Sequence, residues 1–74
     1  MEDKIQEKLE EKYIFKIEVK WRDFRIYDVY CEIDKEKRFE IPIIYDTRST
    51  TEANISNIMM KIDNELVKLF KKEN

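Results

Sequence analysis

The sequence has no histidine and no glycine, and its 74 residues include only one cysteine and one proline. Histidine is the usual general base near neutral pH and the commonest metal ligand, so catalytic pairs built on it are excluded. Glycine-rich phosphate loops need the close backbone approach that glycine allows, and they are excluded as well. One cysteine cannot form a cysteine-only zinc site. We therefore expect no enzymatic activity, no catalytic residue, no cofactor and no metal site.

Charged side chains make up 43% of the chain and apolar side chains 42%, with a net charge of −2. The length predicts one small domain over residues 1–74. The chain has no apolar run of 18 residues, which predicts that no helix crosses a membrane, and no signal peptide is visible at the N-terminus. The unpaired Cys31 favours a reducing compartment. These features together predict a cytoplasmic protein.

Three segments alternate apolar and polar residues with the period of two that half-buried strands show. The predicted strands cover residues 13–21, 24–33 and 38–45. Short connections without glycine predict an antiparallel meander, with turns somewhat longer than the tight hairpin types that glycine favours. Pairing Phe15 with Val29, and Val29 with Ile43, puts the odd-numbered apolar residues on one face. Pro42 then falls on an edge strand, where its missing N–H is tolerated.

Two segments have the spacing of an amphipathic helix. Residues 50–71 carry apolar residues three and four apart, and Ser49 with Glu52 forms a capping box in which Ser49 is the N-cap. Residues 2–12 carry a narrower stripe, and like charges four residues apart make this short N-terminal helix marginal. The order (α)βββα predicts an α+β fold in which the long C-terminal helix packs on one face of a three-stranded antiparallel meander.

The even-numbered face of the sheet is predicted to hold a protein interface, because apolar residues on a solvent face need a cover. The candidate interface residues are Ile14, Phe24, Ile26, Tyr30, Pro42 and Ile44. In the register above, four of them are neighbours, and Phe24 and Ile26 extend the patch toward the first turn. Two covers remain open: the N-terminal helix, docking Ile5 and Leu9, or a protein partner, which includes a second copy. The first strand is expected to have an unblocked edge.

The charge distribution disfavours a nucleic acid partner. Residues 13–48 hold eight basic and eight acidic residues, whereas a phosphate-binding surface needs a clear positive excess. The element order resembles that of double-stranded-RNA-binding domains, but Ser49 to Ala53 stand where that family has a basic segment. The stretch Thr50 to Ala53 is similar to the opening of the helix in small HicB-type antitoxin domains.

In size and composition the chain resembles the accessory proteins of phages and mobile elements, anti-CRISPR proteins among them. That resemblance implies a small non-enzymatic module that binds another protein and inhibits a host enzyme or a defence complex. The first alternative is a nucleic-acid-binding or transcription-regulating module, and the second is a structural homodimer. The expected partner is thus a protein, with a second copy as the other option, and no membrane.

Overall fold

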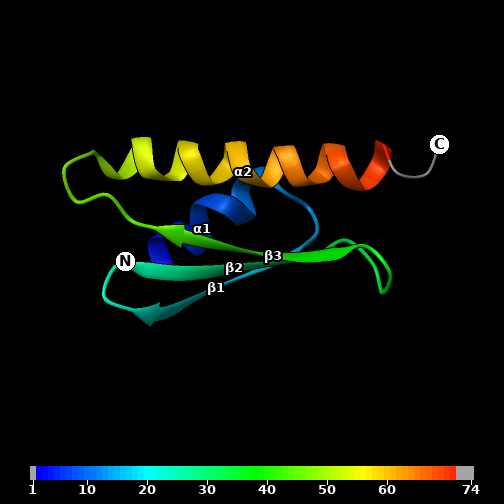
Figure 1. Cartoon of the computed structure of the whole chain (residues 1–74), viewed down its shortest axis with the longest axis horizontal. Coiled ribbons are helices and arrows are strands. Elements are labelled where there is room, and N and C mark those ends of the chain that lie inside the picture. Colours follow the sequence, from blue (N-terminus) through cyan, green and yellow to red (C-terminus); the bar gives the residue numbers. More distant parts are fainter. Residues whose placement is uncertain (1, 72–74) are drawn as a thin grey trace.

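A computed structural model of the chain describes residues 2–71, so Met1 and residues 72–74 of the predicted domain lie outside the described residues. The strands form one antiparallel sheet in the order β1-β2-β3, preceded by a short helix and followed by a long one (Figure 1). This arrangement confirms the predicted α+β fold with the order (α)βββα. The elements are α1 (Glu2–Lys12), β1 (Lys16–Asp23), β2 (Ile26–Glu32), β3 (Arg38–Ile44) and α2 (Thr51–Lys71).

The first hairpin turn lies two residues later than predicted. Asp23 pairs with Ile26, so Phe24 and Arg25 form a tight turn, and Phe24 adopts a positive φ of 48°. The expectation that a chain without glycine avoids tight turns was wrong here, because Phe24 takes the left-handed conformation that glycine usually supplies. The second turn, residues 33–37, has the longer form expected. There the Asp34 carboxylate accepts two backbone N–H bonds.

The strand register also differs from the prediction. Val29 pairs with Val19 and Ile41, not with Phe15 and Ile43, a difference of four residues on β1 and two on β3. The displaced first turn explains the change on β1, since the turn sets the register of a hairpin. Both differences are even, so each side chain keeps its predicted face. Odd-numbered strand residues therefore still face the helices, except Asp23, which lies beyond an irregularity in the register after Trp21.

Both helices lie on the same side of the sheet (Figure 1). Ile5 and Leu9 of α1 are fully buried in the same cluster as Ile58 and Ile62 of α2. The alternative in which α1 covers the outer face is therefore wrong. The helix α1 packs on β1 and also contacts α2, so it completes the helical layer over the sheet. The buried apolar core is Ile5, Leu9, Ile17, Val19, Tyr27, Val29, Cys31, Ile41, Ile43, Tyr45, Ile55, Ile58 and Ile62.

The helix α1 also covers the free edge of β1. The Gln6 amide donates to the carbonyl of Ile17 at 2.5 Å and accepts from the N–H of Val19 at 2.8 Å. The Glu2 carboxylate accepts from the N–H of Trp21 at 2.5 Å. These side chains replace bonds that a fourth strand would make, so exposed donors and acceptors are satisfied. The prediction of an unblocked first edge was wrong for this reason.

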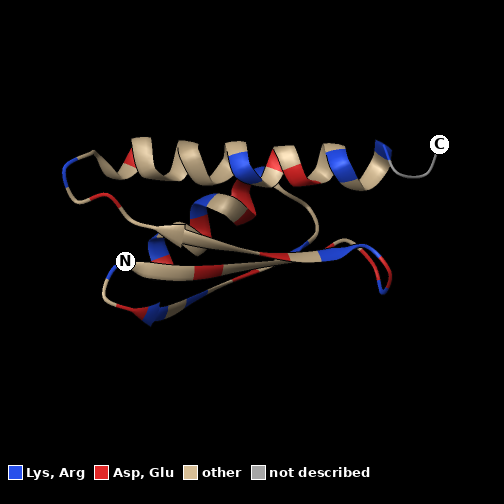
Figure 2. Ribbon diagram, viewed as in Figure 1, with Lys and Arg blue, Asp and Glu red and all other residues tan. Residues whose placement is uncertain are grey.

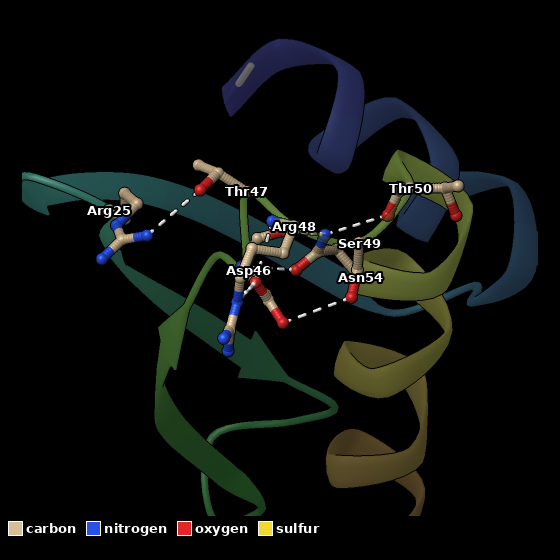
Figure 3. A network of polar contacts seen from close by, with 7 residues as sticks. All are labelled: Arg25, Asp46, Thr47, Arg48, Ser49, Thr50 and Asn54. Carbon is tan, nitrogen blue, oxygen red and sulfur yellow. Dashed lines mark hydrogen bonds and ion pairs between the residues drawn. The ribbon is translucent and has the colours of Figure 1, made fainter.

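The loop between β3 and α2 is held by Asp46 and the buried Asn54 (Figure 3). Asn54 accepts from the backbone N–H of Asp46 at 2.7 Å, and its amide donates to the carbonyls of Asp46 and Thr50, both at 2.9 Å. The Thr50 hydroxyl accepts from the N–H of Ala53, so Thr50 is the N-cap. The predicted N-cap, Ser49, instead donates to the Asp46 carboxylate.

Candidate protein interface

The outer face of the sheet is mostly charged. Lysine, arginine, aspartate and glutamate alternate along the strands and at the second turn (Figure 2). Glu18 lies within ion-pair distance of Lys16 and Lys20, and Arg22 pairs with Asp28 through two hydrogen bonds. These pairs are exposed and therefore contribute little to stability. The centre of this face is a solvated polar surface rather than an apolar one.

Tyr30 lies at this polar centre. It pairs with Glu18 on one side and Glu40 on the other, and its hydroxyl donates to the Glu32 carboxylate at 2.6 Å. This hydrogen bond, with some desolvation, raises the pKa of the Tyr30 phenol. The predicted adjacency of Tyr30 and Ile14 is wrong, because it required the register that placed Phe15 opposite Val29. Ile14 precedes β1 and is fully exposed, at the end of the sheet away from the first turn.

The structure does bring four of the predicted interface residues together at the first turn. We call Phe24, Ile26, Pro42 and Ile44 the turn patch. Ile26 pairs with Ile44, Pro42 pairs with Asp28 one step along the same face, and Phe24 lies in the turn that leads into Ile26. Phe24 is 82% exposed and Ile44 is 69% exposed. Two large apolar side chains are thus in solvent at the end of the sheet where the first turn lies.

Among the described residues, Phe24 is the one that has a positive φ. For a bulky residue this conformation is strained, and strain of this kind persists only where surrounding structure holds it. The indole N–H of Trp21 donates to the Phe24 carbonyl at 2.7 Å and so helps to fix the turn. Trp21 was absent from the predicted interface because its alternation assigns it to the helix side. Its position at the end of the hairpin was the available signal, and it is 57% exposed.

A hollow of about 490 Å³ adjoins the turn patch, lined by Arg25, Ile44, Tyr45, Asp46 and Arg48. Arg25 donates to the Thr47 hydroxyl at 3.2 Å, and Arg48 lies 3.3 Å from the Asp46 carboxylate (Figure 3). The side chain of Arg48 is 91% exposed. Two guanidinium groups therefore border the apolar patch.

The single thiol does not contribute reactive chemistry to this surface. Cys31 is fully buried in the core, and burial raises the pKa of its thiol to about 11. A thiol is nucleophilic only as the thiolate, so Cys31 acts as a small core residue. Among residues 2–71, no three aspartate, glutamate or cysteine side chains gather as metal ligands would.

Comparisons of the chain with family models, with curated proteins and with solved structures gave no match. Over residues 2–71, neither helix has both the length and the apolar character needed to cross a membrane.

Proposed function

We propose that this chain is a non-enzymatic protein-binding module and that the turn patch is its contact surface. The observation that carries the proposal is Phe24. A phenylalanine that is 82% exposed, in a strained backbone conformation, contributes little to the fold and has a conformational cost. That combination is accounted for if the ring is buried in a complex.

The composition of the surface supports the same proposal. Interfaces combine an apolar centre, often aromatic, with a polar rim in which arginine is enriched. Phe24 and Ile44 supply the apolar centre, and Arg25 and Arg48 supply the rim. The matching surface on the partner has an apolar pocket bordered by acidic or carbonyl groups. Tyr30 and Ile14 are not part of this proposed surface, because charged neighbours surround one and the other lies at the opposite end of the sheet.

An inhibitor of a host enzyme or defence complex is the specific role we propose for the module. Inhibition by occupation of a partner's site requires a stable body and one projecting surface, and it requires no catalytic group. The buried, unpaired Cys31 suits the reducing environment of the cytoplasm, where such partners are found.

The test compares two exposed isoleucines. Immobilised wild-type protein, the Ile44→Lys variant and the Ile14→Lys variant are each incubated with lysate of the organism that encodes the chain or of its host. Retained proteins are then identified by mass spectrometry. Ile44→Lys should lose the specific protein that the wild type and Ile14→Lys retain, and circular dichroism should show all three folded. Equal retention by Ile44→Lys would refute the turn patch as the contact surface.

A further inference from the structure

The two edges of the sheet are different. The edge of β1 is covered by Gln6 and Glu2 of α1. On the other side β3 is the outermost strand. The N–H of Tyr45 donates to the carbonyl of Arg25, and bonded pairs recur at every second residue of an antiparallel ladder. The odd-numbered residues of β3 therefore bond to β2, and the even-numbered ones direct their backbone groups away from the sheet.

The outward groups on β3 include a short stretch that can accept another strand. Arg38 and Glu40 each present an N–H and a C=O there, whereas Pro42 presents only a C=O. A partner strand can therefore form a regular ladder centred near Phe39, with Pro42 at its end. The proline prevents the ladder from extending along the whole edge.

We propose that two copies of this chain associate through β3, antiparallel about a two-fold axis at Phe39, into one continuous sheet. In this register Arg38 of each copy lies opposite Glu40 of the other. Directly opposed residues of opposite charge stabilise a strand pair, and the symmetry provides this pair twice. Pro42 falls opposite Glu36 of the second copy, beyond the central ladder.

The helix side of the same edge is complementary as well. A groove of about 300 Å³ lies between β3 and the second half of α2, lined by Phe39, Glu65, Lys68 and Leu69. In the proposed register the Phe39 side chains of the two copies meet at the axis, beside this groove. The two α2 helices run antiparallel across the axis, and the exposed Glu65–Lys68 ion pair of each copy borders the groove. The helix side of the edge therefore places balanced charge beside the apolar contact at Phe39.

The cover on β1 explains why such an assembly stops at two copies. An uncovered second edge would allow strands to add without limit. Because α1 occupies the Ile17 carbonyl and the N–H groups of Val19 and Trp21, β1 is blocked to a regular added strand, and the same β3 surface is used on both sides of a closed two-fold interface. This inference does not depend on partner binding by the turn patch, whose member Pro42 enters here only as the end of the ladder.

Charge exchange tests the register. Light scattering after size exclusion should give the wild type twice the 9.2 kDa mass of one chain. Arg38→Glu places two carboxylates opposite each other and Glu40→Arg places two guanidinium groups opposite each other, so each variant should raise the dimer dissociation constant about tenfold or more. An equimolar mixture of the two variants restores both opposite-charge pairs and should recover the dimer, which also shows that both variants fold.

A disulfide test fixes the axis independently. Because Cys31 pairs with position 39 within one chain, the test is made in a Cys31→Ala background. There Phe39→Cys places the two thiols of the dimer at directly opposed positions about 4.5 Å apart between Cα atoms, which a disulfide can span. Mild oxidation should therefore link this variant covalently, and Phe15→Cys, another half-buried phenylalanine of the same core, should stay unlinked. A wild-type protein that stays monomeric in light scattering at increasing protein concentrations overturns the proposal. A dimer that neither charge variant weakens, or that the mixture fails to restore, also overturns the proposal. Another surface, such as exposed Met60 and Val67 of α2, would then hold the dimer together.

Discussion

The strained turn at Phe24 makes a prediction that separates backbone conformation from side-chain contact. The changes are Phe24→Asn and Phe24→Ala. Both remove the ring, but asparagine tolerates a positive φ and alanine does not. The left-handed conformation costs an ordinary L-residue about 1–2 kcal/mol, and asparagine avoids most of that cost. The Phe24→Asn variant should therefore be more stable than the Phe24→Ala variant by about 1 kcal/mol.

The comparison with the wild type follows from exposure. A phenylalanine side chain that is fully buried removes about 150–250 Å² from water, and Phe24 is 82% exposed. Its ring therefore buries about 40 Å², worth about 1 kcal/mol at about 25 cal/mol per Å². Phe24→Ala should lower the free energy of unfolding by up to that amount. Phe24→Asn should leave it nearly unchanged, because relief of strain offsets the lost contact.

Urea unfolding followed by circular dichroism measures both differences, and a thermal shift of about 4–8 °C per kcal/mol is expected for a domain of this size. Equal stability of the two variants would refute the claim that the turn is strained. Capture of the partner from lysate then tests function. Both variants lack the aromatic ring, so both should fail to retain the partner. If both variants retain the partner, the exposed ring has no role in binding.

Three further predictions concern the fold. Gln6→Ala leaves the Ile17 carbonyl and the Val19 N–H without their side-chain partner. It should lower the free energy of unfolding, measured by urea titration, by about 1–3 kcal/mol. Gln6→Glu keeps only the acceptor and should have an intermediate effect. Ile62→Ala should cost about 2–5 kcal/mol because Ile62 is fully buried, while Val67→Ala on the exposed side of α2 should change stability by less than about 0.5 kcal/mol. Backbone N–H bonds lower the pKa of Asp34 and of Asp46 in the folded state. The stabilisation from the two carboxylates is therefore complete above the unfolded pKa of about 3.9 and is lost as pH falls below that value. Melting temperatures between neutral and acid pH should show this loss, and Asp34→Asn should make the loss smaller.

The face that each strand residue occupies could be predicted from the sequence, but the register could not. Alternation alone places Val29 and Ile41 toward the helices and Tyr30 away from them. Alternation is unchanged when a strand shifts by two residues, so it gives no information on which residues are opposite each other. That information lies in the turn, and nothing in the composition of Phe24 and Arg25 indicates a tight turn.

The position of α1 is the second point that the sequence left open. The stripe of Ile5 and Leu9 shows that this helix needs a surface, and both faces of the sheet had apolar residues to offer. The deciding contacts are polar. Gln6 and Glu2 reach the backbone of β1, an interaction that hydrophobic periodicity does not report.

The predicted interface residues fall into two groups, those whose position follows from the alternation of the strand and those whose position depends on the register. Phe24 and Ile26 were out of phase with the rest of their predicted strand, and that irregularity marks the turn and the start of β2 correctly. Pro42 and Ile44 joined them because their face follows from parity alone. Ile14 and Tyr30 depended on the register, and with the correct register they lie apart from the patch.

The two proposals have a geometric consequence when they are combined. A two-fold axis at Phe39 that continues the sheet keeps the outer faces of both copies on one side. The turn patches then lie on that common face at its two ends, because β3 of one copy runs opposite to β3 of the other. A dimer built this way presents Phe24 and Ile44 twice, in a fixed geometry. A partner that is itself two-fold symmetric, or that carries repeated sites at the matching separation, would bind both patches, and the second contact would form at a high effective concentration. The covered edge of β1 and Pro42 on β3 both favour this dimer, because they limit strand pairing to the short stretch of β3 around Phe39.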